Sequence, residues 1–538
     1  MPIERQPSGD PRVGRSFVSP KAAVASPNAL ATSAGVDVLT RGGTAVDAMV
    51  AVNAALGVVY PHMSGPGGDA FWLVHDSASG QQHVYNASGG AARAATIDRY
   101  PKAVPSRGPG AALTVPGAVD GWCRTHERFG GLSLADCLAR AIEYARDGFP
   151  VSPGLARYTA DHADLLTAVP TTAETFLGTA FEPPRVGDIL SNHRLADTLE
   201  AIAEDGHAGF YEGRIAQEIG NYLRTHDGVL SADDLAAHTG EWVEPLRVPY
   251  RGRIVVVPPP TSEGMATAQI LGILDRLDVA GLKDDPVGYV DTLVRATALA
   301  FADRDRYLAD PAFHEVPTSE ILDPEYLAAC AARTQATGIV PPEKLPRAAG
   351  DTTFSCAVDA QGNVAAVVQS LYWEWGSGVV AGDTGVLLQN RGAYFSLDPS
   401  NRDCLQPGKR PASTLTNGLL VSPTGPELVF GAMGGEGEPQ TQAALVTRIL
   451  DHGMSVQEAI DAPRWLLGRT WGETRRGLRL ESRFGRSVAD DLTARGHENV
   501  SLADDFGDVF GHAQAIRIHP DRLEAASDPR SDGAAFGL

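Results

Sequence analysis

Two adjacent threonines, Thr352 and Thr353, open a run of strand-forming residues directly after a stretch without any regular pattern. That stretch, residues 337–351, reads TGIVPPEKLPRAAGD, and its prolines and glycines predict an exposed connector. A threonine hydroxyl is a weak nucleophile at neutral pH and needs a base within hydrogen-bond reach. Cleavage before Thr352 would create an α-amino group, with a pKa of about 7.7–8.0, as that base on the same residue. Taken alone, the pair also fits an ordinary strand start.

The residues that follow, TTFSCAVDAQGNVAAVVQS (352–370), form two β-prone runs on either side of a strong turn signal at 359–363. We predict a β-hairpin centred near Gln361. In that register, residues whose numbers sum to about 722 face each other, because the two strands run antiparallel. Ser370 is therefore expected opposite Thr352.

Other common catalytic arrangements are missing from the sequence. It contains no H-E-x-x-H motif, no G-x-S-x-G elbow, no Walker loop and no G-x-G-x-x-G between a strand and a helix. The 14 histidines are dispersed, and their spacing does not call for a metal. We therefore expect neither a metal nor a cofactor, and the threonine pair remains the catalytic candidate.

The composition is typical of a folded protein, and the net charge disfavours binding to nucleic acid or to anionic membranes. Hydrophobic residues make up 43% of the 538 residues, enough for two or three domains or one large sandwich. The formal net charge of −21 repels nucleic acid and anionic membrane surfaces, so we expect neither as a partner. A small anionic substrate could bind only where local cations override this field.

The cysteines and the N-terminal residues bear on the cellular compartment. The five cysteines are scattered without C-x-x-C spacing, which argues against a disulfide framework and a zinc site and favours a reducing compartment. They are Cys123, Cys137, Cys330, Cys356 and Cys404. The segment MPIERQPSGDPRVGRSF has no apolar signal region, and no later stretch approaches about 18 uninterrupted apolar residues. We therefore expect a cytoplasmic protein.

Helical patterns dominate the first part of the chain. Residues 26–60 predict two buried helices separated by Gly42-Gly43, and the second is apolar on nearly every face. Such a helix must be covered on most sides, which implies a layered architecture. A strand is expected within HMSGPGGDAFWLVHD (62–76), and further strands at 379–390, 417–423 and 427–433. Further helices are expected near 117–129, 134–147, 193–205, 214–224, 287–308, 440–453 and 455–461.

Several segments together resemble the gamma-glutamyltranspeptidase family. The segment SPNALATSAGVDVLTRGGTAVDAMVAVNAALGVVYPHMSGPGGDAF (26–71) looks like the family's N-terminal signature. VPGAVDGWCRTHERFGG, AFADRDRYLADP and PGKRPASTL look like later family blocks, and DTTFSCAVDAQGN (351–363) resembles its processing site. These blocks run in family order from about residue 20 to residue 470, which makes the resemblance specific.

The resemblance implies an α+β fold, a four-layer αββα N-terminal nucleophile hydrolase sandwich. The precursor would cut itself between Asp351 and Thr352 into a large subunit (1–351) and a small subunit (352–538) that stay together and could pair further as a homo-oligomer. Thr352 would then attack a substrate amide and form an acyl-enzyme, which water or an amine resolves. By the family's pattern, Ser370 would touch the nucleophile; the alternative is an ordinary strand serine.

The same pattern assigns an oxyanion hole. Gly434 and Gly435, in GAMGGEG, would donate backbone N–H groups to it, because glycine lets the backbone approach a ligand closely. A plain turn at the end of a strand is the alternative.

The expected substrate pocket departs from the family's glutathione-binding pattern. Where the large subunit should supply an arginine, the sequence has Ser88 or Gly90, and Arg93 lies a few residues too late. In the small subunit, Tyr372 replaces an asparagine, Arg391 a glutamine and Tyr394 an aspartate. Two hydroxyl residues expected near the substrate carboxylate, Ser413 and Thr414, remain.

These changes remove partners of a substrate ammonium and add a guanidinium suited to a carboxylate. The segment QSLYWEWGSGVVAGDTGVLLQNRGAYFSLDP (369–399) is more similar to the hydrolase-like branch that includes oxamate amidohydrolases. We therefore expect hydrolysis of a small acid-bearing amide, with Arg391 as the carboxylate clamp. Glutathione hydrolysis or gamma-glutamyl transfer is one alternative, and a non-catalytic binding protein is another.

Some residues in this region also fit purely structural roles. Arg391 could form a surface or intersubunit salt bridge, and Glu374 could be a pocket wall, a polar lid or simple packing between two tryptophans. Lys409 and Arg410 are expected to make structural or intersubunit contacts.

Overall fold

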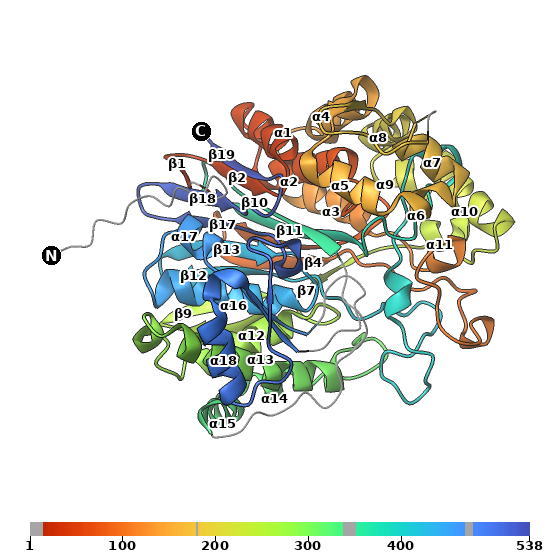
Figure 1. Cartoon of the computed structure of the whole chain (residues 1–538). Helices are drawn as coiled ribbons and strands as arrows, with labels where there is room; N and C mark the ends of the chain where they lie inside the picture. The colour runs from red at the N-terminus through yellow and green to blue at the C-terminus, as the bar shows by residue number, and fades with distance from the viewer. Residues whose placement is uncertain (1–13, 15, 179–180, 337–350, 469–476) are drawn as a thin grey trace.

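Two stacked antiparallel β-sheets form the centre of the protein, and helices cover the outer face of each (Figure 1). The computed structural model describes residues 14, 16–178, 181–336, 351–468 and 477–538. The β10 sheet contains, in spatial order, β19 (Ala534–Gly537), β2 (Ala23–Ser26), β10 (Asp351–Val358), β11 (Val364–Tyr372), β3 (Asp69–Asp76), β4 (Gln81–Asn86) and β7 (Glu241–Val243). The β13 sheet contains β1 (Phe17–Ser19), β18 (Leu523–Ser527), β17 (Ala513–Ile518), β13 (Gly425–Ala432), β12 (Asn417–Ser422), β9 (Arg253–Val257) and β8 (Leu246–Tyr250).

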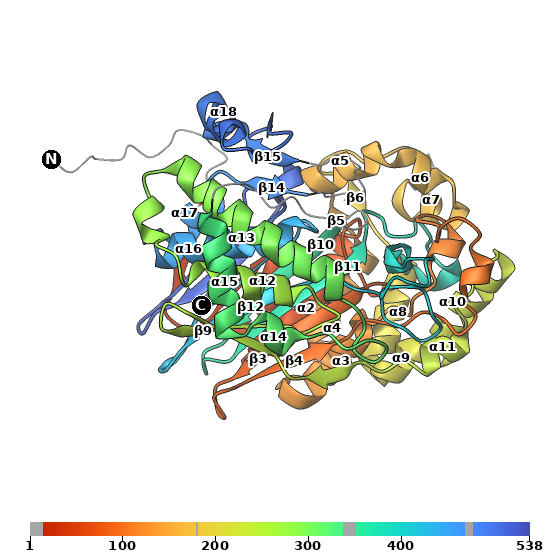
Figure 2. The ribbon, with the colours of Figure 1, turned by 90° about the horizontal axis from the view of Figure 1, so that it is seen from below.

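Helices from the first half of the chain lie over the β10 sheet. They are α1 (Ala29–Thr40), α2 (Ala45–Val59), α3 (Ala118–Phe129), α4 (Leu134–Asp147), α5 (Pro153–Asp161), α6 (Ala163–Thr167), α7 (Pro170–Phe176), α8 (His193–Asp205), α9 (His207–Tyr211), α10 (Gly213–Thr225) and α11 (Ala232–Ala236). Helices on the β13 side are α12 (Gly264–Leu274), α13 (Pro286–Tyr307), α14 (Thr318–Ile321), α15 (Pro324–Gln335), α16 (Gly437–Leu450), α17 (Val456–Asp461) and α18 (Arg486–Ala494). Figure 2 shows α12, α13 and α15 side by side on that face.

Shorter elements complete the fold. Two small sheets contain β5 (Phe149–Pro150) with β6 (Ile189–Leu190), and β14 (Trp465–Leu467) with β15 (Leu478–Glu481) and β16 (Ser501–Ala503). The 3-10 turns are η1 (Ile97–Arg99), η2 (Pro109–Ala111), η3 (Ala280–Leu282), η4 (Gly382–Thr384), η5 (Arg391–Tyr394), η6 (Ser482–Phe484) and η7 (Asp508–Phe510).

The structure has three large hydrophobic clusters. One lies between the β10 sheet and its helices, one between the two sheets, and one between the β13 sheet and its helices. In β10, Phe354, Cys356 and Val358 point between the two sheets, whereas Ala357 faces the helices over the β10 sheet. Because a strand turns successive side chains to opposite faces, burial of both faces requires a cover on each side. The predicted four-layer αββα sandwich is confirmed.

The two helices predicted within 26–60 are present as α1 and α2. The side chain of Thr44 accepts the backbone N–H of Asp47, and the carboxylate of Asp47 accepts that of Thr44, a capping box that fixes the start of α2. All 15 residues of α2 are buried, as its apolar sequence predicted. The helices expected near 117–129, 134–147, 193–205, 214–224, 287–308, 440–453 and 455–461 are also present, as α3, α4, α8, α10, α13, α16 and α17.

The predicted hairpin is β10–β11, and its register is the expected one from Thr353↔Gln369 to Val358↔Val364. Near the threonines the prediction is wrong, because Asp351 pairs with Tyr372 and a β-bulge follows. Thr352 therefore lies opposite the Ser370–Leu371 step instead of opposite Ser370 alone. Most of the connector predicted at 337–351 lies outside the described residues.

The strand predicted at 379–390 is also wrong. This segment contains η4 and an isolated bridge between Val380 and Leu387. Gly382 and Gly385 have φ angles of 56° and 68°, so the chain turns back before a ladder can form.

Both sheets contain strands from each side of the Asp351–Thr352 bond. In the β10 sheet, β10 lies between β2 and β11, and β11 lies beside β3. Residues 1–351 and 352–538 are therefore not separate halves of the sandwich. After a cut, ladder hydrogen bonds and the three shared hydrophobic clusters would still hold the fragments together.

Candidate active site

Thr352 lies at the start of β10 with 1% of its surface exposed. Its Oγ1 has no hydrogen-bond partner among the described residues. The next residue is fixed in the ladder, since the Thr353 hydroxyl donates to the carbonyl of Gln369 at 3.0 Å. The bulge thus presents a buried, unpaired hydroxyl at the end of a rigid strand, which suits a nucleophile held for reaction.

Ser370 is buried beside the bulge, on β11. Its Oγ accepts the backbone N–H of Tyr372 at 2.7 Å. Tyr372 has a φ of 83° and Trp375 a φ of 62°, a backbone conformation that is uncommon for bulky residues and recurs at functional sites. Ser370 therefore helps to hold the sharp turn that leaves β11 next to Thr352.

The Gly434–Gly435 pair lies where β13 ends and α16 begins. The two φ angles are 133° and 57°, conformations that side chains disfavour. Gly431 places this end of β13 over the start of β10, since a Cβ there would lie 2.4 Å from the Phe354 ring. The turn precedes a helix N-terminus, where free N–H groups and the helix dipole favour negative charge. Its location suits the predicted oxyanion hole.

Arg391 is the unusual residue of the site. It lies in η5, is 1% exposed, and its guanidinium is centred 4.7 Å from the Tyr372 ring. None of its three side-chain nitrogens has a hydrogen-bond partner among the described residues. Burial lowers the pKa of Arg391, but an arginine remains charged at neutral pH. The alternative role of Arg391 in a surface salt bridge therefore has no support within the described chain.

Two buried acids lie in the electrostatic neighbourhood of Arg391, and no sequence pattern had singled out either of them. Asp69 Oδ1 accepts the backbone N–H groups of Gly89 (3.0 Å) and Gly117 (3.3 Å) and the amide of Gln389 (3.0 Å). Burial raises the pKa of Asp69 to about 6 in spite of these bonds and of Arg391. Its Oδ2 has no partner among the described residues.

Glu438 is the second of these acids. Its Oε2 accepts the Thr416 N–H at 3.2 Å, and its Oε1 has no partner within the described chain. Burial raises the pKa of Glu438 well above its usual range, and nearby Glu263 adds to this shift. Burial also raises the pKa of Glu263, to about 8, although Arg304 donates to its carboxylate at 3.0 Å. Burial thus favours the neutral forms of Glu438 and Glu263.

The structure also describes the other predicted substrate residues, Tyr394, Ser413, Thr414 and Glu374. The Tyr394 ring lies 6.1 Å from that of Tyr372 and borders a cavity of about 340 Å³. Ser413 and Thr414 are buried, and the Thr414 hydroxyl has no partner among the described residues. Glu374 is mostly buried, and its carbonyl accepts a hydrogen bond from Arg107.

Three basic residues that were considered but not assigned to the site make other contacts or are exposed. Arg93 has an exposed side chain and does not replace the missing large-subunit arginine. Lys409 donates to the carbonyls of Arg402 and Cys404, and Arg410 pairs with Glu241 at 2.7 Å. These contacts are structural, as predicted, and Arg410 joins the two sides of the expected cut.

One cluster among the described residues has the spacing of metal ligands: Asp47, His126 and Cys137 offer atoms within 4.8 Å of one another. Asp47 Oδ2, however, accepts the backbone N–H groups of Thr44, Gly131 and Leu132 and caps α2. The His126 Nε2 lies 2.9 Å from the Leu132 carbonyl, so it carries a proton in this arrangement. Helix capping accounts for the cluster.

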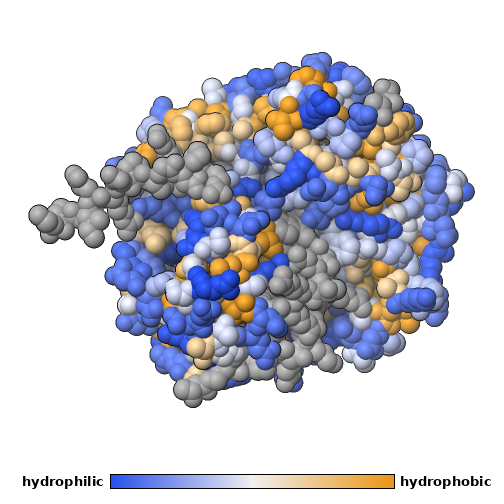
Figure 3. All heavy atoms as spheres, viewed as in Figure 1, coloured by the Kyte–Doolittle hydropathy of each residue, from blue (hydrophilic) through white to orange (hydrophobic). Residues whose placement is uncertain are grey.

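No described helix combines the length and the apolar composition needed to cross a bilayer. On the face shown in Figure 3, hydrophobic side chains form small separate patches among hydrophilic ones.

Comparisons with known proteins extend over nearly the whole chain. The family model for gamma-glutamyltranspeptidase matches residues 31–538. The chain is 42% identical over 529 residues to the glutathione hydrolase-like YwrD proenzyme of Bacillus subtilis, covering 98% of this chain and 100% of that one. It is also 42% identical over 531 residues to the oxamate amidohydrolase proenzyme of Klebsiella pneumoniae, covering 97% and 99%.

A solved structure gives the same result. The cephalosporin acylase of Bacillus halodurans matches with a TM-score of 0.88 at 33% identity, covering 100% of this chain and 99% of that one. These relatives are named as enzymes and two as proenzymes, so the non-catalytic alternative has no support. The chain therefore belongs to the gamma-glutamyltranspeptidase family and is an N-terminal nucleophile amidohydrolase made as one precursor of two subunits.

Proposed function

We propose that the chain cuts its own Asp351–Thr352 bond and then uses Thr352 to hydrolyse a small amide that bears a carboxylate. The observation that carries this substrate class is the buried guanidinium of Arg391, which has no partner among the described residues. Arg391 stacks on Tyr372, whose backbone pairs with Asp351 next to the nucleophile. A carboxylate bound by Arg391 would leave a short acyl chain to reach Thr352.

Processing uses the hydroxyl of Thr352 as the nucleophile. Its Oγ1 attacks the carbonyl carbon of Asp351, the C–N bond breaks, and the proton moves to the departing nitrogen. The resulting ester links Asp351 to the hydroxyl of Thr352, whose amino group is now free. Water cleaves the ester, which restores the hydroxyl and leaves a carboxylate on Asp351.

Turnover repeats this chemistry on the substrate. The α-amino group of Thr352 accepts the hydroxyl proton as Oγ1 attacks the amide carbonyl, and Gly434 and Gly435 donate N–H groups to the developing oxyanion. The proton passes to the leaving amine, and an acyl-enzyme remains. Water, activated by the same amino group, then hydrolyses the ester.

Gamma-glutamyl hydrolysis or transfer is the second candidate, and Asp69 is the observation that favours it. With a pKa of about 6, the buried Asp69 is mainly ionised at neutral pH and could pair with a substrate ammonium while Arg391 holds the carboxylate. The YwrD relative is named as glutathione hydrolase-like, whereas the other 42% relative is named as an oxamate amidohydrolase.

Denaturing electrophoresis tests the processing step. The wild type should give two fragments, 1–351 and 352–538, and Edman sequencing of the smaller one should begin at Thr352. Thr352→Ala should remain one band, while Thr352→Ser, which keeps a hydroxyl, should be cut more slowly. A small fragment that begins at any other residue would refute the nucleophile assignment.

Two substrates, oxamate and a gamma-glutamyl anilide, test which acyl group the enzyme accepts. Ammonia release from oxamate and aniline release from a gamma-glutamyl anilide are measured with the mature protein, with and without an amine acceptor. We expect oxamate-type hydrolysis without acceptor stimulation. Fast anilide cleavage that an acceptor accelerates would replace the first candidate by the second.

We also propose a cytoplasmic location. The structure contains no disulfide between the five cysteines, which are all buried, and this fits a reducing compartment. Cell fractionation would test this, and recovery from the periplasmic or secreted fraction would contradict it.

A further inference from the structure

The turn Met433–Gly435 lies against residues 510–513, which join η7 to β17 and are called the brace segment. The Met433 N–H donates to the His512 carbonyl at 2.8 Å. A Cβ on Gly434 would lie 3.1 Å from the Cα of Gly511. Gly511 has a φ of 69°, and a Cβ on it would lie 1.8 Å from the Met433 carbonyl oxygen. The two backbones thus meet with no room for a side chain at Gly511.

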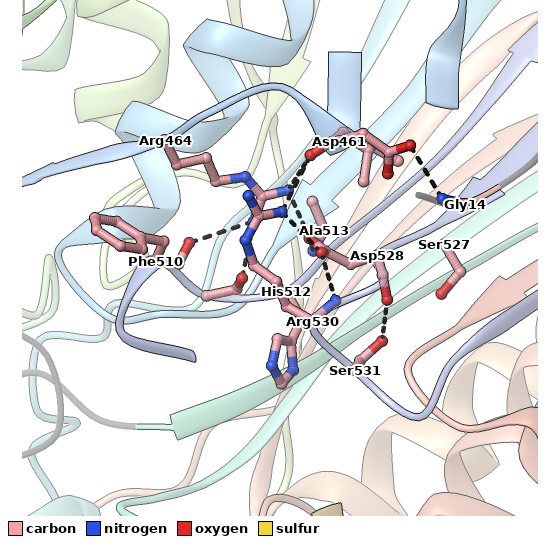
Figure 4. A network of polar contacts seen from close by, with 12 residues as sticks. Gly14, Asp461, Arg464, Phe510, His512, Ala513, Ser527, Asp528, Arg530 and Ser531 are labelled. Atoms are coloured by element: carbon pink, nitrogen blue, oxygen red, sulfur yellow. Dashed lines mark hydrogen bonds and ion pairs between the residues drawn. The ribbon is translucent and has the colours of Figure 1, made fainter. Parts of the chain in front are cut away.

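Arg464 holds the brace segment from behind (Figure 4). Its Nη1 donates to the carbonyls of Phe510 (3.3 Å) and Gly511 (2.8 Å), and its Nη2 donates to Asp528 Oδ2 at 2.5 Å. The same carboxylate oxygen accepts the Ala513 N–H at 2.7 Å. One buried arginine–aspartate pair therefore fixes both ends of the brace segment.

A second arginine anchors this pair. Arg530 donates to Asp528 Oδ1 at 3.0 Å and to Glu481 Oε1 at 2.8 Å. Burial alone would raise the pKa of Asp528, but Arg464 and Arg530 lower it to about 2. Burial lowers the pKa of Arg464 to about 10. Arg464, Asp528 and Arg530 are therefore charged at neutral pH, and all three are buried.

Buried ion networks are poor stabilisers, because the cost of removing charges from water offsets most of their attraction. Their charge-assisted hydrogen bonds do fix geometry closely. An oxyanion hole depends on such geometry, since its donors act at about 2.7–3.1 Å and a small displacement lowers the rate. The network holds the brace segment against the turn Met433–Gly435, where the proposed oxyanion hole needs a fixed geometry.

We propose that Arg464 and Gly511 are positioning residues for the oxyanion hole. Neither touches the substrate, and both act through the backbone contact between the brace segment and the turn Met433–Gly435. The proposal rests on the proposed function, in which Gly434 and Gly435 donate to the oxyanion.

Gly511→Ala tests the contact, and Gly453→Ala is its matched control. Gly453 has nearly the same φ, 70°, but a Cβ on it would meet no atom within 4 Å, so its variant carries the backbone strain alone. With oxamate or the anilide, whichever the wild type hydrolyses, we expect Gly511→Ala to lower kcat by roughly 10²-fold. KM should change by less than about twofold, because the ground-state substrate does not use the oxyanion hole. Gly453→Ala should match the wild type.

Arg464→Lys tests the hydrogen bonds from Arg464 to the brace segment and keeps a positive charge beside Asp528. Arg448→Lys is the control, because Arg448 is also buried and donates to two carbonyls, of Ala459 (3.3 Å) and Pro463 (2.6 Å), but does not contact the brace segment. We expect Arg464→Lys to lower kcat by about 10-fold at unchanged KM, because only the transition state uses the oxyanion hole. Arg448→Lys should leave kcat within about twofold.

The outcomes distinguish a failure of the positioning role from a failure of the proposed function. Equal kcat in Gly511→Ala and Gly453→Ala, or a loss that appears only in KM, would overturn the role of the brace segment alone. Activity that survives in Thr352→Ala, or a wild type that hydrolyses neither amide, would overturn the proposed function and the positioning role with it.

Discussion

Replacing Arg391 by methionine should raise stability and abolish selectivity in the same protein. The guanidinium is 1% exposed and has no hydrogen-bond partner among the described residues. A buried charge without a bonded counter-ion destabilises the folded state, and a methionine of similar length would fill the same space. Exchange of buried charged groups for apolar ones of similar volume often stabilises by about 1–4 kcal/mol, so we expect a gain in that range.

The free energy of substrate interaction that Arg391→Met removes should be larger than the free energy of unfolding that it adds. A bidentate guanidinium–carboxylate contact consists of two charge-assisted hydrogen bonds at about 1.5–3 kcal/mol each. Their loss corresponds to about 3–6 kcal/mol, or roughly a 10²- to 10⁴-fold lower kcat/KM for an acid-bearing amide. An amide of the same size without the acid group should be affected far less, because it never formed these bonds.

Urea unfolding midpoints measure the change in stability, and kcat/KM for the amides with and without the acid group measures the change in selectivity. Arg448→Met is the matched control: Arg448 is also buried, but it bonds the carbonyls of Ala459 and Pro463, so its removal should lower stability and spare selectivity. If Arg391→Met lowered stability and kept the preference for the acid-bearing amide, Arg391 would be a structural residue and the clamp would be wrong.

Two further predictions concern groups beside the nucleophile. Burial raises the pKa of Asp69 to about 6, so the folded state binds this proton more tightly than the unfolded one, and stability falls as pH rises from about 4 to about 6. The shift of about two units is worth about 3 kcal/mol, and Asp69→Asn should remove that pH dependence from the urea midpoints; equal slopes in both proteins would contradict it. Ser370→Ala leaves the Tyr372 N–H without its 2.7 Å acceptor and should loosen the turn beside Thr352. Self-cleavage, followed by electrophoresis over time, should slow by about 10-fold, and an unchanged half-time would show that Ser370 is only a strand residue.

Local sequence patterns predicted the elements that carry the nucleophile. The β10–β11 hairpin follows from two alternating runs around a five-residue turn, and the Asp359 carboxylate fixes that turn by accepting the N–H groups of Gln361 (3.0 Å) and Asn363 (2.9 Å). The same carboxylate accepts the Ala45 N–H at 3.0 Å, which ties the turn to α2. This last contact spans more than 300 residues and has no local signal.

The parts of the site that sequence patterns missed depend on such distant contacts. The bulge at Thr352 breaks the one-to-one pairing on which the hairpin register was predicted, and no local pattern indicates the positive φ of Tyr372. Asp69 and Glu438 lie in glycine-rich junctions that look like ordinary turns, and their shifted pKa values come from burial by other segments. A residue's charge state is set by its neighbours in space, which a single sequence does not reveal.

The pair Arg391 and Asp69 also distinguishes the two candidate substrates by the direction of proton exchange. A carboxylate bound to Arg391 adds a negative charge near Asp69, which raises the pKa of Asp69 above about 6, so binding an acid-bearing amide takes up protons near neutral pH. A gamma-glutamyl group would also bring an ammonium, which pairs with the Asp69 carboxylate and lowers that pKa, so binding would release protons. KM for the first class should therefore rise as pH increases above about 6, and KM for the second should fall as pH increases towards about 6 and then level off. Asp69→Asn should flatten either profile, and a wild-type profile that Asp69→Asn leaves unchanged would show that Asp69 does not sense the bound acyl group.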